Sequence, residues 1–352
     1  MQHRLIGRRA ASVAVFAFVT LLPCLSRPPF AAAEVSGPPP RTANVPRPHD
    51  APEPPFPRSY FLDRLDRAEA ESRSRPYWVS SELEAASAER RLSDYRSVLL
   101  NDDIVAFYGS PISKRMGILG VHPIPELDRL LGEWAAAYDG VNGERGVKKA
   151  FYVIYGTVWP EGEIGFLRES RLLEYIEYAR QNDMLVFVDH QIGKYSVAEA
   201  TRRILPFLRY PNVHLALDPE WRTTQPMVEI GSVTAEEVNE AQRLIEDYLE
   251  EHGLPGERLL VIHQFNWRMI LGRERVRTDF ARVRLVHCAD GFGPPAMKRS
   301  SYDFNARAPN MPIKGFKLFF KSNVPGAGYD EPLIPPAEVM ALNPRPYLVM
   351  YQ

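Results

Sequence analysis

Two acidic residues stand two positions apart in the segment Leu217–Trp221, directly after an apolar run that reads as a strand. Residues two apart on a strand point to the same side, so Asp218 and Glu220 are expected to share one face. Two carboxylates that close in a walled site cannot both ionise freely. One pKa should therefore rise, giving a proton donor near neutral pH beside a carboxylate that stays ionised. Trp221 follows directly and offers a surface for sugar stacking or a low-dielectric wall.

Polar side chains also follow the other apolar runs of the chain. The structural alternative for each is a solvated strand end or a turn cap, as when Asp218 caps a turn and Glu220 faces water. We expect them instead to bind the hydroxyl groups of a substrate or to assist its reaction. The predicted substrate-binding residues are Tyr108, Asp189, Gln191, Trp221, His263, Gln264, His287, Asp290, Lys321 and Tyr351.

Histidines at these positions raise the alternative of a metal site. His190, His263 and His287, with Asp189 and Asp290, are residue types that bind metals in barrel hydrolases. However, the first predicted strand lacks a His-x-His pair, and His190 should face away from Asp189 because adjacent strand residues alternate. We therefore expect hydrogen-bonding histidines, no metal and no cofactor, with a metal-dependent hydrolase as the alternative.

The elements that position these residues are short apolar runs alternating with helical stretches. The runs are almost continuously apolar, as is typical of strands buried on both faces. Eight of them at a spacing of roughly 30 residues predict a single-domain (β/α)8 barrel, whose active sites lie at the C-terminal ends of the strands. The predicted strands are Ile104–Tyr108, Ala150–Tyr155, Leu185–Asp189, Val213–Asp218, Leu259–His263, Val283–His287, Gly315–Lys321 and Tyr347–Tyr351.

Between the runs the sequence predicts helices, and one carries a capping box formed by Thr234 and Glu237. The crossover Trp267–Phe280 is short, and Gly293–Lys314 is expected to be a long loop. An open doubly wound sheet is disfavoured because Gly109-Ser110-Pro111 breaks any glycine-rich phosphate loop after the first strand. The clearest predicted helices are Ile124–Tyr138, Leu167–Asn182, Val197–Leu208 and Ala235–His252, and Ser80–Leu92 is expected to cover the barrel ahead of the first strand.

The first 75 residues have the features of an export signal and a spacer. Arginines precede the apolar run Ala10–Leu22, and Ala31–Ala33 offers a cleavage site, so residues 1–33 are predicted to be a signal peptide. Lipidation of Cys24 is the alternative, but Pro23 precedes it where a small residue is needed. Residues 34–75 are expected to form a proline-rich linker with a charged segment, and residues 76–352 to form the barrel. This organisation predicts a secreted, periplasmic or cell-envelope protein without stable membrane insertion after cleavage.

Composition narrows the class of partner. The formal net charge is −1, with acidic and basic residues interspersed, so no basic patch indicates nucleic-acid binding. After cleavage at residue 33 only Cys288 would remain, and one cysteine cannot form an internal disulfide. We expect a monomer whose partner is a carbohydrate substrate.

The Asp-x-Glu at the end of the fourth predicted strand resembles the motif of family-18 chitinases and family-25 lysozyme-type muramidases, both barrel glycosidases. The resemblance implies that Glu220 is the proton donor and that Asp218 helps a substrate acetamido group act as nucleophile. Val213 and Ala216 occupy positions where the longer chitinase motif has acidic residues. Together, residues and resemblance predict a glycoside hydrolase-like enzyme acting on a polysaccharide or cell-wall glycan by carboxylate acid/base catalysis. The alternatives are a metal-dependent hydrolase and a non-catalytic glycan-binding barrel.

Overall fold

The structure is a computed structural model that describes residues 97–322 and 324–352. The predicted signal peptide, the linker and the helix expected over residues 80–92 lie outside the described residues, as does Cys24. A short helix, α3 (Val98–Asn101), leads directly into the first barrel strand.

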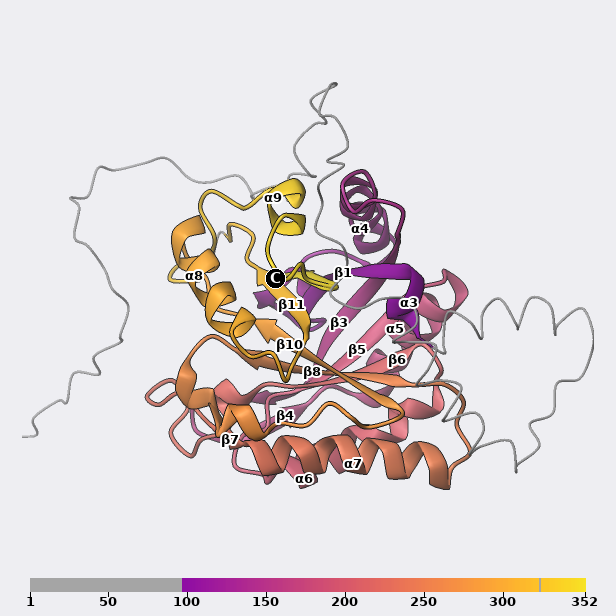
Figure 1. Ribbon diagram of the computed structural model, residues 1–352, viewed down its shortest axis with the longest axis vertical. Helices are drawn as coiled ribbons and strands as arrows, with labels where there is room; N and C mark the ends of the chain where they lie inside the picture. Colours follow the sequence, from indigo (N-terminus) through magenta and orange to yellow (C-terminus); the bar gives the residue numbers. More distant parts are fainter. Residues whose placement is uncertain (1–96, 323) are drawn as a thin grey trace, which may run out of the picture.

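Eight parallel strands close into a barrel, as the sequence predicts (Figure 1). Each strand pairs with the next, and the ring closes because β1 pairs in parallel with both β12 and β3. Two short strands, β2 (Ser113–Gly117) and β4 (Ile164–Phe166), extend β1 and β3 as antiparallel hairpins. The barrel strands are β1 (Asp102–Ser110), β3 (Gly146–Val158), β5 (Leu185–His190), β6 (Val213–Leu217), β8 (Arg258–Gln264), β10 (Val283–Ala289), β11 (Ile313–Leu318) and β12 (Leu348–Tyr351).

Helices cover the outside of the barrel between most of its strands (Figure 1). The capping box of Thr234 and Glu237 starts α7 (Ala235–Glu251) as predicted, and Ser196 with Glu199 forms another at α6 (Val197–Ile204). Between β8 and β10 the described chain has only the 3-10 turns η4 (Trp267–Met269) and η5 (Arg273–Arg275), with a two-residue strand, β9 (Ile270–Leu271), between them. The main helices are α4 (Ile124–Asp139), α5 (Glu169–Gln181), α6 (Val197–Ile204), α7 (Ala235–Glu251), α8 (Pro295–Ala306) and α9 (Pro336–Met340).

The sequence interpretation is wrong about the segment Gly293–Lys314, which contains the helix α8 rather than a continuous loop. Prolines at positions 294 and 295 suggest a loop, but they occupy the cap and first turn of the helix, where a missing N–H costs nothing. The seventh barrel strand also differs, because β11 ends at Leu318 rather than at Lys321.

Alternating residues of each strand divide the apolar interior into two layers. On β1, Ile104, Ala106 and Tyr108 belong to a cluster inside the barrel, while Val105 and Phe107 pack in the cluster formed with the surrounding helices. The alternation follows from the strand period of two and tells which side chains can reach the barrel interior. Within the described chain no helix is long and apolar enough to cross a membrane.

A buried polar network joins the start of β1 to the segment before β12. Asp103 accepts a hydrogen bond and ion pair from Arg345, and its other oxygen lies 3.0 Å from Nε of Arg145. Asn142 adds a hydrogen bond of 3.1 Å to Asp103. The network lies at the N-terminal ends of the strands, the face of such barrels associated with stability rather than chemistry.

Candidate active site

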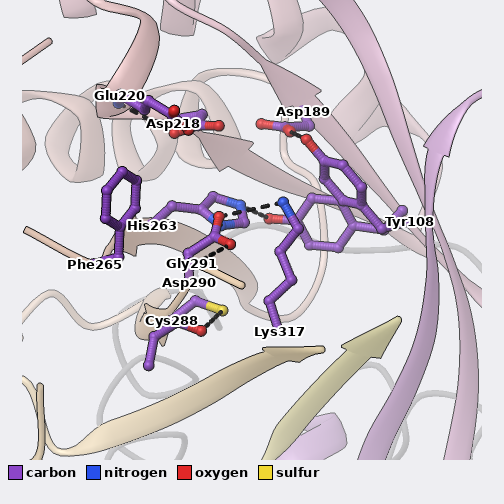
Figure 2. A network of polar contacts seen from close by, with 12 residues as sticks. Tyr108, Asp189, Asp218, Glu220, His263, Phe265, Cys288, Asp290, Gly291 and Lys317 are labelled. Atoms are coloured by element: carbon purple, nitrogen blue, oxygen red, sulfur yellow. Dashed lines mark hydrogen bonds and ion pairs between the residues drawn. The ribbon is translucent and has the colours of Figure 1, made fainter. Parts of the chain in front are cut away.

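Polar side chains from seven strands converge at the C-terminal end of the barrel interior (Figure 2). Except for Glu220, they alternate with the residues that face the helices and so continue the inward-facing rows of their strands. Apart from Glu220, which is partly exposed, these side chains are buried. The cluster consists of Tyr108 on β1, Tyr152 on β3, Asp189 on β5, Asp218 and Glu220 after β6, His263 on β8, Asp290 after β10 and Lys317 on β11.

Asp218 and Glu220 are held together by a turn rather than by strand alternation. β6 ends at Leu217, and Asp218 caps the 3-10 turn η3 (Pro219–Trp221) by accepting a hydrogen bond of 3.2 Å from the backbone N–H of Glu220. The two side chains overlap in the view of Figure 2, and the charge of Asp218 acts on the carboxyl group of Glu220. The structure therefore shows both the capping role of Asp218 and its closeness to Glu220.

The two carboxyl groups of this turn have raised pKa values for related reasons. Burial raises the pKa of Glu220 to about 8, and the negative charges of Asp218 and Asp290 add to the rise. Burial also raises the pKa of Asp218 to about 6. The charge of His263 opposes this rise, and the negative charge of Asp189 adds to it. At neutral pH the turn therefore presents a protonated Glu220 beside an ionised Asp218.

His263 and Lys317 share one carboxylate oxygen. Oδ2 of Asp290 lies 3.2 Å from Nδ1 of His263, an ion-pair distance without aligned hydrogen-bond geometry, and 3.2 Å from Nζ of Lys317. Its Oδ1 accepts a hydrogen bond of 2.7 Å from the backbone N–H of Gly291. Nε2 of His263 lies 2.8 Å from the hydroxyl oxygen of Tyr152.

The ionisation of this group follows from its contacts. Burial alone would raise the pKa of Asp290, but Lys317 and His263 hold it below its ordinary value. Burial would lower the pKa of His263, yet the contact with Asp290 raises it well above its ordinary value. The pKa of Lys317 is raised too, because the surrounding carboxylates outweigh its burial. One carboxylate is thus shared by two buried cations, whose charges also act on Asp189 and Asp218.

Tyr108 connects the two halves of the cluster. Its hydroxyl donates a hydrogen bond of 3.0 Å to Oδ2 of Asp189, and Nζ of Lys317 lies 3.9 Å from its ring centroid. Burial raises the pKa of Asp189, against the opposing charges of His263 and Lys317. Burial also raises the pKa of Tyr108 well above its ordinary value, so the tyrosine stays a donor.

Six of the twelve predicted site residues come together in this cluster. They are Tyr108, Asp189, Asp218, Glu220, His263 and Asp290. Gln191 lies close by in the loop after β5, but its side chain accepts a hydrogen bond of 2.9 Å from the backbone N–H of Val158. Trp221 closes the η3 turn and is partly exposed.

Four predicted residues lie away from the cluster. Gln264 and His287 each stand one position away from an inward-facing strand residue, so their side chains face the helices. There they form a hydrogen bond of 2.8 Å with each other. Tyr351 also faces outward, packing on Trp134 of α4 at a centroid distance of 4.3 Å. Lys321 lies beyond the end of β11, where its exposed side chain pairs with Glu331.

Tyr152 and Lys317 belong to the cluster but were not among the predicted site residues. The alternation of inward-facing and outward-facing residues along each strand could have identified both. Tyr152 stands directly opposite Tyr108 in the register of β1 and β3, and Lys317 continues the inward row of Gly315 on β11. The inward row is visible only once the end of each strand is known.

The histidines do not converge as a metal site would require. His263 faces the barrel interior, whereas His287 faces α8 and His190 packs against Phe166 and Tyr195. Among residues 97–322 and 324–352, no group of three or more His, Cys, Asp or Glu is arranged to hold a metal ion.

Fold and cluster together place the chain in the class of (β/α)8 barrels with an acidic site at the C-terminal ends of their strands. No protein-family model matches the chain, and no curated protein matches it. Several solved structures are similar in shape. One is a chitinase from Chromobacterium violaceum, 11% identical, with a TM-score of 0.36 over 61% of this chain and 68% of that chain. Another is an oxaloacetate acetylhydrolase in complex with oxalate, 12% identical, with a TM-score of 0.42 over 74% of this chain and 79% of that chain.

A third similar structure is a 2,3-dimethylmalate lyase of the PEP mutase/isocitrate lyase superfamily. It is 13% identical, with a TM-score of 0.37 over 78% of this chain and 81% of that chain. The similar structures thus include both a glycoside hydrolase and lyase-type enzymes. They assign no activity to this chain, because one fold can host many functions.

Proposed function

We propose that this protein is a glycoside hydrolase in which Glu220 protonates the leaving oxygen. The observation that carries the proposal is the η3 turn, where a carboxyl group with a pKa of about 8 sits beside one with a pKa of about 6. Glycosidases use such a pair, one carboxylic acid and one carboxylate flanking the bond to be broken. As the C–O bond breaks, the proton of Glu220 passes to the glycosidic oxygen, and the negative charge of Asp218 stabilises the positive charge on the sugar. Water then supplies the new hydroxyl group and restores the proton of Glu220.

The charge of the site supports a sugar over an anionic metabolite. Phosphate and carboxylate substrates are typically held by arginine forks or by free lysines. The cluster contains no arginine, and its lysine, Lys317, is already paired with Asp290. With Glu220 protonated, the three aspartates of the cluster outnumber its two cations and would repel an anion, whereas an uncharged or cationic glycan fits.

Exposed aromatic residues support a polymeric substrate. Trp159 follows β3, Trp267 follows β8 and Phe292 follows β10, so all three lie in loops on the C-terminal side of the barrel. Their exposed fractions are 52%, 61% and 55%, which leaves ring surface open for stacking of sugar rings. Large aromatic side chains are normally buried, and several exposed ones on one face indicate a binding surface.

We also propose that the chain is exported after removal of residues 1–33 and acts as a monomer on glycan outside the cytoplasm. This part rests on the sequence alone, namely the basic start, the apolar run and the alanines before residue 34. N-terminal sequencing of the exported protein tests it. A start at or near Glu34 is expected, and a lipid-modified Cys24 would contradict it.

The catalytic proposal is tested on a panel of glycans that includes chitin, chitosan, peptidoglycan and β-glucan. Glu220→Gln should lower turnover about 10² to 10⁴-fold, the effect of losing a positioned general acid. Its melting temperature should stay close to that of the wild type, because glutamine keeps the shape of the side chain. The matched control is Glu229→Gln, an exposed glutamate in the following loop, which should keep full activity. No hydrolysis of any glycan by the wild type, or full activity of Glu220→Gln, would contradict the proposal.

A further inference from the structure

Asp189 carries a buried oxygen without a partner at the centre of the cluster. Its side chain is fully buried, and Oδ2 accepts the hydrogen bond from Tyr108. Within the described chain, Oδ1 has no hydrogen-bond partner. A buried carboxylate oxygen left in this state is costly, and this oxygen is free to accept a hydrogen bond from a bound molecule.

The unpartnered oxygen faces a second carboxylate. Asp189 and Asp218 extend toward one another from the neighbouring strands β5 and β6 in Figure 2. The strands hold this approach, because the backbone N–H of Asp218 bonds to the carbonyl of His190 at 3.2 Å. Two facing carboxylates repel each other unless a proton or a cation lies between them.

The cations of the cluster do not fill this gap. Lys317 and His263 both lie 3.2 Å from the same oxygen of Asp290. No basic side chain of residues 97–322 and 324–352 forms an ion pair with Asp189 or Asp218. Within the described chain, His263 and Lys317 therefore act on Asp189 and Asp218 only from a distance, and no cation contacts either carboxyl group directly.

We propose that Asp189 and Asp218 together bind a protonated amine of the substrate, so that the glycan is one whose amino sugars carry free amino groups. An ammonium group supplies up to three donors and a positive charge, and charge-assisted hydrogen bonds are the stronger kind. A sugar hydroxyl would satisfy Oδ1 of Asp189 but would leave the repulsion between the carboxylates in place. The inference rests on the proposed glycosidase function, whose catalytic turn it shares.

This inference changes one role implied by the resemblance to chitinases. A free amine has no acetamido oxygen to act as nucleophile. Asp218 then acts through its charge alone, holding the amine in the ground state and stabilising positive charge at the sugar as the bond breaks. Glu220 keeps its role as proton donor.

The inference is tested by calorimetric binding of three hexasaccharides near neutral pH: a glucosamine hexamer, its fully N-acetylated form and cellohexaose. The full chain carrying Glu220→Gln is used, so that no probe is hydrolysed. The glucosamine hexamer should bind at least about tenfold more tightly than the other two, as expected for a charge-assisted hydrogen bond. Adding Asp189→Asn should remove that preference.

The control for charge is Asp183→Asn, which makes the same chemical change at an exposed residue before β5 that pairs with Lys148. It should leave the preference intact. If Asp189→Asn does not fold, Asp218→Asn removes the other half of the pair and should also remove the preference.

Three outcomes would overturn the inference. Equal binding of all three hexasaccharides, or a preference that survives Asp189→Asn, would show that the pair does not recognise an amine. Binding of Mg²⁺ alone that Asp189→Asn abolishes would make the pair a metal site. These results differ from failure of the glycosidase proposal, in which the wild type hydrolyses none of the glycans on the panel, charged or neutral.

Discussion

The backbone N–H of Glu220 donates a hydrogen bond of 3.2 Å to Oδ1 of Asp218, so one short turn carries both carboxyl groups of the proposed catalytic pair. The hydrogen bond fixes the spacing of the pair without using either group's acidic proton. Between about pH 6 and about pH 8, the pair can therefore carry one proton, with Glu220 as the acid and Asp218 as the anion.

The first prediction is a bell-shaped dependence of kcat/KM on pH. Activity needs ionised Asp218 and protonated Glu220, so it should fall as the pH drops through about 6 and as it rises through about 8. Because the groups interact, the two limbs describe the pair rather than single residues. Initial rates on a hydrolysed glycan give the profile.

The Asp218→Asn variant checks the assignment of those limbs. Removing the negative charge of Asp218 lowers the pKa of Glu220, so the alkaline limb should move to lower pH. The acid limb should lose the contribution of Asp218. An alkaline limb that stays in place would show that another group controls it.

The second prediction concerns Asp290, whose one carboxylate oxygen pairs with both His263 and Lys317. Asp290→Asn removes the carboxylate that contacts both buried cations and should lower the free energy of unfolding by about 3–5 kcal/mol. Asp279→Asn is the control, because its pair with Arg277 is exposed and should contribute less than about 1 kcal/mol. Urea unfolding at neutral pH measures both.

The pH dependence of that loss has a definite sign. Asp290 has a folded-state pKa below its ordinary value, so its stabilisation is present above the unfolded pKa and is lost as the pH falls. The difference between wild type and Asp290→Asn should therefore shrink in acid. A loss below about 1 kcal/mol at neutral pH would mean that the three side chains do not act as a buried ion group.

The third prediction concerns closure of the barrel. Arg345→Met leaves buried Asp103 with one fewer cation where the segment before β12 meets β1, and should cost about 3–5 kcal/mol. Arg299→Met breaks an exposed pair with Glu338 and should cost less than about 1 kcal/mol. Similar losses in the two variants would argue against a structural role of the buried network.

The fourth prediction concerns Cys288, which is buried inside the barrel beside His263 in the register of β8 and β10. Burial raises the pKa of its thiol, so the nucleophilic thiolate is disfavoured. Labelling in the native state should be slower than in urea by at least about a thousandfold, since it requires local opening of the barrel. Cys288→Ala should keep activity, and an inactive but folded variant would instead indicate a reacting cysteine.

Much of the fold could be predicted from the sequence, because nearly continuous apolar runs indicate strands that are buried on both faces. All eight barrel strands were predicted, since runs such as Leu185–Asp189 contain little that favours a helix or loop. Helix α8 was missed because Pro294 and Pro295 resemble a loop until the cap position is known. The end of β11 was misplaced because Phe319 and Phe320 continue the apolar run beyond the last strand residue, Leu318.

The site could be predicted only in part, because residues near the strand ends alternate between the barrel interior and the surrounding helices. Asp189 and His263 were predicted and lie in the cluster, but Gln264 and His287 differ from inward residues by a single position. A prediction that lists every polar residue near a strand end necessarily includes both faces. Glu220 and Asp218 were predicted to lie on one side because both were treated as strand residues. In the structure, the turn that begins at Pro219 brings them together instead.

The most direct test of the central claim is the carboxyl titration of Glu220 by ¹³C NMR in protein labelled at glutamate. Comparison of wild type with Glu220→Gln assigns the resonance, and no substrate is needed. A carboxyl group that titrates near pH 8 and is missing from the variant is the predicted result. A Glu220 resonance that titrates near the ordinary value of about 4.3 would contradict the claim, because the residue would then carry no proton to donate at neutral pH.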